Sequence, residues 1–276
     1  MLVMFGALGM AGAAVLVLRS VGFLRAPVYD LQAPPVHVST HPAVLIFSKT
    51  NWYIHKDAIP AAQTLLRRLA SNAGGTAVTT DNAAVHNPRD LALFDLVVWN
   101  NVSGDVLTDS QRSALREYVE HGGGFLALHN AGGTPGLPWH WYVDELIGAS
   151  FIGHPLFPQL QTAIVRLNTD DPMTRGLPAV WSRVDEWYSF DRVPRGKAVR
   201  IVATLSEATY SPRFIWKDIA MGPNHPIMWR HCVGRGRVFF SAMGHTAESY
   251  EEPTYVTLLD RAVRWTARVD SGDCDR

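Results

Sequence analysis

The chain has 276 residues, 47% of them hydrophobic, and its 25 Lys and Arg residues balance 25 Asp and Glu residues. This composition is enough for a sizeable core, and one α/β domain with insertions is the simplest fit. The balanced charge offers no basic field for a phosphate backbone, so nucleic acid is not expected as a partner. Cys232 and Cys274 are too few for a disulfide framework, although one bridge between them stays open.

The N-terminus differs from the rest of the chain. Residues 1–18 contain no charged side chain and are just long enough to span a bilayer as a helix. The first cations, Arg19 and Arg25, follow the apolar run instead of preceding it, which favours an uncleaved anchor over a cleaved signal peptide. We therefore expect residues 1–25 to be a transmembrane anchor or signal segment that meets the membrane through residues 1–24. The side of the membrane stays open.

Residues 26–42 contain four prolines and are expected to form an extended linker. An α/β domain should then occupy residues 43–270, followed by a polar tail at 271–276. In its first half, apolar runs predict strands at 43–48, 76–80, 94–99 and 124–129. Helical spacing predicts helices at 56–72 and from Thr108 or Asp109 onward. This alternation indicates a doubly wound parallel sheet.

Beyond residue 155 the pattern changes. Further strands are expected at 161–167, 197–205 and 237–242, with a closing helix at 252–269. The stretches between them are rich in loop-forming residues and tryptophan. We expect them to form extra strands and loops over the ligand edge of the sheet.

The stretch 122–155 contains the strongest site signal. Its apolar run Phe125 to Leu128 ends at His129, which small residues follow. Ligands of parallel α/β sheets bind beyond the carboxyl ends of the strands, so His129 occupies the place where chemistry is expected. His245 has an equivalent position after the run VFFSAM. Either histidine could instead fasten a neighbouring loop.

Several other polar residues are predicted at the same edge. Histidines can share acid and base work, or bind a divalent metal such as zinc with a carboxylate. We expect His55, His129, Asp185 and Glu186 to be catalytic, with Glu186 as general base, and His129, His154 and His245 as candidate metal ligands. Asp185 and Glu186 are adjacent, so on a strand only one can enter the cleft; the alternative is that both form surface ion pairs.

Aromatic side chains near these residues suit the apolar face of a sugar ring. Trp139, Trp187 and Tyr188 are predicted substrate contacts, together with His225. They could equally be packing residues of a lid, and His225, which precedes a proline, could fasten a loop.

Motifs along residues 43–268 resemble the ThuA-like (trehalose utilisation) family. They are Lys49-Thr50 with His55, NVSGD from Asn101, GGGFLALHNA, Trp139 to Tyr142, GASFIGHP, Asp185 to Tyr188, His225-Pro226-Ile227 with Trp229, and GRGRVFFSAMGH. The resemblance implies a flavodoxin-like fold similar to class I glutamine amidotransferases and a role in carbohydrate metabolism, on keto or disaccharide sugars.

Two departures limit what the resemblance transfers. Leu128-His129-Asn130 stands where an amidotransferase has its cysteine nucleophile, so amide hydrolysis through a thiolate is not supported. In the first loop, Trp52-Tyr53-Ile54 precedes His55 without the arginine common in the family.

Two functional hypotheses follow. The first is a membrane-anchored hydrolase, lyase or isomerase acting on a small sugar or keto-sugar by acid–base or metal-assisted chemistry. The second is an inactive accessory or binding subunit of a membrane protein complex.

Overall fold

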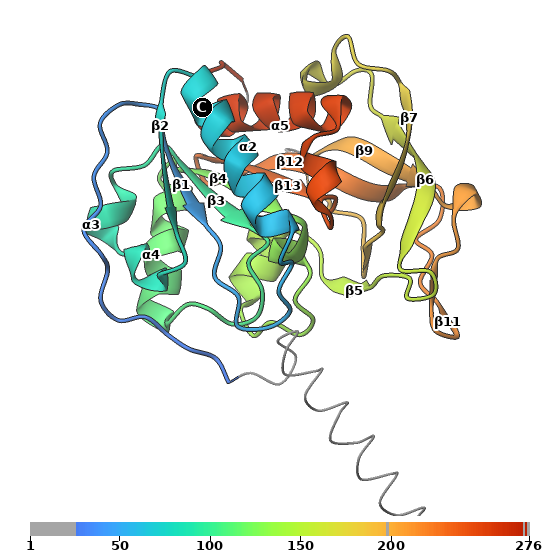
Figure 1. Ribbon diagram of the computed structural model, residues 1–276, viewed down its shortest axis with the longest axis horizontal. Helices are drawn as coiled ribbons and strands as arrows, with labels where there is room; N and C mark the ends of the chain where they lie inside the picture. The colour runs from blue at the N-terminus through green and yellow to red at the C-terminus, as the bar shows by residue number, and fades with distance from the viewer. Residues whose placement is uncertain (1–25, 197–198, 273, 275–276) are drawn as a thin grey trace, which may run out of the picture.

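The computed structural model describes residues 26–196, 199–272 and 274. A nine-stranded sheet forms the centre of the molecule (Figure 1). In sheet order its strands are β2 (Thr76–Thr80), β1 (Ala43–Phe47), β3 (Leu96–Asn100), β4 (Gly124–Leu128), β13 (Gly236–Ser241), β12 (His225–Val233), β9 (Arg200–Ser206), β6 (Leu160–Leu167) and β7 (Val180–Glu186).

The sheet has a parallel half and an antiparallel half. Strands β2, β1, β3, β4 and β13 run parallel in the flavodoxin-like order. The next four each run antiparallel to their neighbours. Two small ribbons pair β5 (Phe151–Gly153) with β8 (Ser189–Phe190) and β10 (Arg213–Phe214) with β11 (Lys217–Asp218). The expected α/β fold is confirmed, but β7 and β12 lie in stretches that we expected to be rich in loops.

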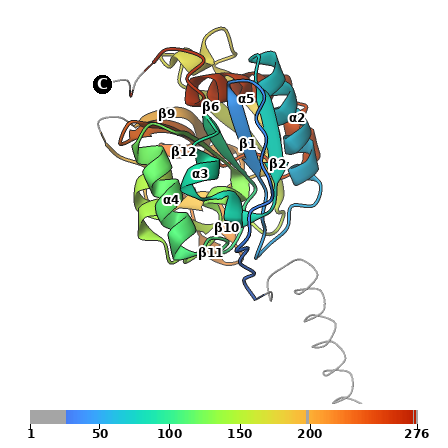
Figure 2. The ribbon, with the colours of Figure 1, turned by 90° about the vertical axis from the view of Figure 1, so that its left-hand side faces the viewer.

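Helices cover both faces of the parallel half (Figure 2). Helices α2 (Ala58–Asn72) and α5 (Pro253–Thr266) lie on one face, and α3 (Pro88–Leu91) and α4 (Asp109–Glu120) on the other. Thr108 begins α4 with a capping box, in which it and Gln111 accept each other's main-chain N–H groups. A π-helical segment, Trp141–Ile147, packs beside α4, where the indole of Trp141 donates to Glu120.

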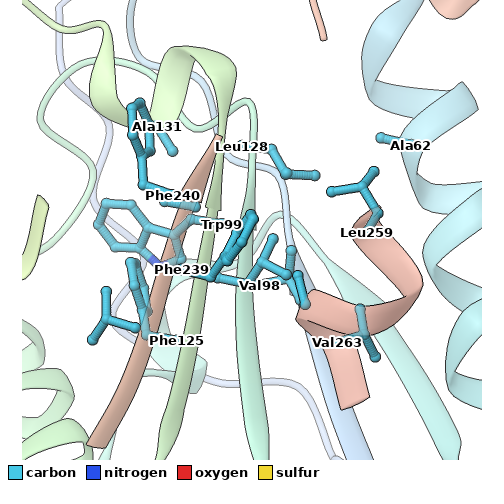
Figure 3. Packing of buried hydrophobic residues seen from close by; sticks show 14 of the residues in the cluster. Ala62, Val98, Trp99, Phe125, Leu128, Ala131, Phe239, Phe240, Leu259 and Val263 are labelled. Carbon is cyan, nitrogen blue, oxygen red and sulfur yellow. The ribbon is translucent and has the colours of Figure 1, made fainter. Parts of the chain in front are cut away.

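The core forms on both faces of these strands. Every residue of β1, β3 and β4 is buried, as the continuous apolar runs predict for central parallel strands. Figure 3 shows Leu259 and Val263 of α5 near Ala62 of α2, while Trp99 and Phe240 pack on the other face. The core thus holds the strands rigidly and fixes where their carboxyl ends lie.

Residues 26–42 run along the full height of the sheet. Asp30 pairs with Lys49 just beyond β1, with Oδ2 to Nζ at 2.7 Å, and the Val28 carbonyl accepts from Asn51. At the opposite edge His41 pairs with Asp95 at 2.6 Å. The segment is bound to the domain from Val28 onward.

Cys232 of β12 and Cys274 form a disulfide, with their Cα atoms 5.6 Å apart. This bridge fastens the C-terminal tail to the sheet. The anchor expected at residues 1–25 lies outside the described residues. Within the described ranges, none of the helices has the length and apolar character needed to span a bilayer.

Candidate metal centre

The residues of the candidate site lie at or after the ends of four strands, all at one edge of the sheet. His55 lies in the loop after β1, His129 directly follows β4, and His245 follows β13. Glu186 is the last residue of β7, which ends at the same edge. The edge is the carboxyl side of the parallel strands, where ligands of such sheets bind.

His129 is held in a constrained conformation. Its φ of 48° lies in the left-handed region, which costs a residue with a side chain about 1–3 kcal/mol. Its Nδ1 lies 2.7 Å from the carbonyl oxygen of Ala242, and only an N–H can donate to that oxygen. This bond fixes the tautomer, so the lone pair of Nε2 points toward the other site residues.

Four donor atoms converge within 4.8 Å of one another. Nε2 of His129 lies 3.1 Å from Nε2 of His55 and 3.3 Å from Nδ1 of His245, and those two atoms are 3.1 Å apart. Glu186 Oε2 lies 3.3 Å from the His129 nitrogen and 3.2 Å from the His245 nitrogen. A tetrahedron whose ligands each lie about 2.0 Å from a central ion has edges of about 3.3 Å. The donor set therefore has the chemistry of a zinc-type site, and five of its six separations match the edges of such a tetrahedron.

The charges of the site favour a carboxylate among imidazoles. Burial raises the pKa of Glu186, but its contacts with His129 and His245 outweigh it and hold that pKa well below its ordinary value. Burial also lowers the pKa of His55, with further lowering from the neighbouring histidines. Burial lowers the pKa of His245, but the hydrogen bond with Glu186 and the charges of Glu186 and Asp185 outweigh it and raise that pKa. The ionised Glu186 is ready to bind a metal ion, whereas a metal ion would displace a proton from His245. The Nδ1 of His55 has no partner among the described residues, so this ring lacks the outer acceptor that His129 has.

A cavity of about 210 Å³ adjoins the cluster. His154 projects into it with Nδ1 3.2 Å from Glu186 Oε1, and Gln159 donates to the same oxygen at 2.5 Å. Tyr188 stacks on the His129 ring, and its hydroxyl lies 3.1 Å from Nε2. A Cβ on Gly133 would meet the Tyr188 ring at 2.7 Å, so glycine permits this close approach.

Asp185 lies behind the cluster and points away from the cavity. Its fully buried carboxylate accepts from the main-chain N–H groups of Gly244 and His245 at 3.0 and 3.1 Å, and from Arg183 at 2.8 Å. Asp185 therefore positions the loop that carries His245, whereas Glu186 enters the cluster.

Three predicted substrate contacts lie away from the cavity wall. Trp139 stacks on Tyr142 beside α4, and Trp187 is buried with its indole donating to the Gln161 carbonyl. His225 is fully buried, with Nδ1 2.7 Å from Glu207 and Nε2 2.7 Å from the Tyr188 carbonyl oxygen. These side chains contact other parts of the protein instead of facing the cavity. Their partners come from segments that are distant in the sequence.

The cavity wall also includes residues that the sequence did not single out as site residues. They are Trp52, Tyr53, Asn130, Phe151, Leu156 and Gln159. Each lies within a few residues of a predicted histidine, so proximity to His55, His129 and His154 was the only available signal.

Comparison with known proteins agrees with this architecture. The family model ThuA, described as trehalose utilisation, matches residues 43–266. A ThuA-like protein of Bacteroides uniformis has a similar structure, with a TM-score of 0.70 and 26% identity, over 85% of this chain and 95% of that chain. One from Parabacteroides merdae gives 0.63 and 18%, over 84% and 91%.

A β-galactosidase of Rahnella sp. R3 shares the fold over 84% of this chain but only 32% of its own, at 13% identity and a TM-score of 0.52. No curated protein sequence matches the chain. Because the family model covers nearly the whole described domain, the chain belongs to the ThuA (trehalose utilisation) family.

Proposed function

We propose that the protein is a metal-dependent enzyme acting on a sugar or keto-sugar. The observation that supports this most directly is the set of four donor atoms from His55, His129, Glu186 and His245, separated by 3.1–3.3 Å wherever a contact joins two of them. Three imidazoles and one carboxylate suit zinc or a similar divalent ion. Bound there, such an ion would supply a Lewis acid that polarises a carbonyl or hydroxyl oxygen of the substrate.

The cavity beside the donors suits one sugar ring. Its volume of about 210 Å³ is smaller than the roughly 300–1,000 Å³ of pockets that enclose drug-sized ligands, so a terminal ring enters and the remainder stays outside. Trp52, Phe151 and Leu156 provide apolar surface, while Asn130 and Gln159 offer amide groups for hydroxyls. The family description, trehalose utilisation, supports a carbohydrate as substrate.

Two residues of the wall are suited to take part in the reaction, one by moving protons and one by orienting the substrate. The Nδ1 of His154 is held between the carbonyl oxygen of Pro155 and the Glu186 carboxylate, which orients the ring and leaves Nε2 for proton transfer. Tyr188 can donate a hydrogen bond to a substrate oxygen, since burial foremost and the Glu186 charge next raise its pKa well above the ordinary value and keep the hydroxyl protonated. We assign His154 as the acid–base residue and Tyr188 as the residue that orients the substrate.

Elemental analysis of the purified full chain tests the metal. The parent should carry one equivalent of zinc or manganese that a chelator removes, and the double variant His129→Ala, His245→Ala should carry none. His140→Ala, at an exposed histidine, is the matched control and should keep the metal. A metal-free parent that gains no thermal stability from added zinc, manganese or cobalt would contradict the proposal and leave the accessory-subunit hypothesis.

Activity is tested separately with 3-keto-glycosides. Turnover by the parent should fall at least a hundredfold in His154→Ala while the metal content stays unchanged, because this change removes proton transfer and leaves the four donors in place. Equal turnover in the two proteins would show that His154 has no part in the reaction.

A further inference from the structure

Exposed apolar side chains gather at the edge of the sheet where the candidate site opens. Single exposed apolar residues are normal in a monomer, but a group of them at one face marks a contact surface. We call this group the apolar rim; its most prominent members are Leu31, Ile152, Phe157, Phe214, Ile215 and Trp216. Trp216 and Phe157 are each 84% exposed and Leu31 is 81% exposed.

Part of the apolar rim lies beside the cavity. In the sequence, Phe157 falls between His154 and Gln159, two residues of the cavity wall. The hairpin of β10 and β11 carries Trp216 and packs near Gly153, where an added Cβ would lie 3.7 Å from the Phe214 ring. Both ribbon views show this hairpin and the start of the described chain on the same side of the molecule (Figures 1 and 2).

The chemistry of the hairpin suits a bilayer surface. Arg213 and Lys217 flank the run Phe214, Ile215 and Trp216, and both cations are exposed. Tryptophan and basic residues together are typical of the membrane–water interface, where the ring lies among the headgroups and the cations meet lipid phosphates. A protein partner would not require this pairing of an exposed indole with flanking cations.

The described part of the chain begins on this same side. Val28 is fixed to Asn51 at the carboxyl edge of the sheet, and residues 1–18 carry no charge. Residues 19–27 can reach at most about 30 Å even when fully extended. If residues 1–18 are inserted in a bilayer, this short connection keeps the apolar rim close to the bilayer surface.

We propose that the apolar rim rests on a lipid bilayer, with Trp216 in the headgroup layer and the cavity mouth facing the membrane surface. Substrate would then reach the cavity along that surface. This arrangement does not depend on the bound metal, because the rim residues are not among the four donors.

The test uses the fluorescence of Trp216. Of the nine tryptophans, all within the described residues, only Trp216 is classed as exposed. The full chain is reconstituted in vesicles of phosphatidylcholine and phosphatidylglycerol, either ordinary or with brominated acyl chains, which quench nearby indoles. Subtracting the emission of Trp216→Phe from that of the parent gives the emission of Trp216. This emission should be at least twofold smaller in brominated vesicles than in ordinary ones.

Trp141→Phe is the control, because Trp141 pairs with Glu120 at the opposite edge of the sheet. Its emission difference should be the same in both kinds of vesicle. An unquenched Trp216, or a full chain that does not float with vesicles at all, would overturn the proposal. Either outcome is independent of the metal analysis, so failure of the lipid contact and failure of the proposed chemistry are distinguishable.

Discussion

Replacing His86 with glutamine should make the fold less sensitive to acid. His86 is fully buried; its Nδ1 donates to the Ala83 carbonyl and its Nε2 accepts from the Trp99 indole at 3.1 Å. Burial lowers its pKa to about 4, although the hydrogen bond to Ala83 opposes this. In the unfolded chain the pKa returns to about 6.5.

These two pKa values determine how the stability of the fold changes with pH. Between pH 6.5 and 4 the unfolded chain binds the proton and the folded protein does not, so the neutral ring contributes stability above pH 6.5 that is lost as the pH falls. At 1.36 kcal/mol per pKa unit, the loss between pH 7 and pH 5 is about 2 kcal/mol. Glutamine keeps an acceptor for the Trp99 indole without titrating, so His86→Gln should remove that part of the pH dependence.

Urea unfolding of the purified chain at pH 7 and pH 5 measures the effect. Parent and His86→Gln should differ in their loss of unfolding free energy by about 2 kcal/mol. His37→Gln, at an exposed histidine, should behave like the parent. Identical pH dependence in parent and His86→Gln would refute the reasoning, since other buried histidines contribute equally to both proteins.

Two further predictions concern the disulfide and Asp185, which positions the loop that carries His245. Replacing Cys232 and Cys274 with serine should lower the unfolding free energy by up to about 4 kcal/mol, given a sequence separation of 42, and reductant should do the same to the parent in a thermal melt. A melting temperature indifferent to reductant would count against the bridge. Asp185→Ala should cost about 3–5 kcal/mol and reduce metal content, because it frees the His245 loop and removes the buried carboxylate that pairs with Arg183 at 2.8 Å. Asp185→Asn should recover part of both, and full metal loading of the alanine variant would show that Asp185 does not position the site.

The sequence predicted the parallel half of the sheet because its signals are local. The apolar runs of β1 and β4 and the capping residue Thr108 act within a few positions. Strand β7 was harder to predict: its buried positions include Arg183 and Asp185 while Val180 and Val184 are exposed, which inverts the usual alternation.

The site was predictable only in part for a related reason. His129 and His245 end apolar strands, which made their place at the sheet edge readable. Trp187 and His225 lie outside the cavity because they bind Gln161 and Glu207, which come from other segments. Nothing in the spacing along one chain encodes those distant contacts.

The disulfide bears on where this fold can be maintained. In a reducing cytosol glutathione and thioredoxin keep thiols reduced, so the C-terminal tail would lose its covalent link to β12. In an oxidising compartment the bridge would persist. A chain that is exported while it folds would therefore gain its last structural constraint only after crossing the membrane, which would tie the stability of the domain to its delivery.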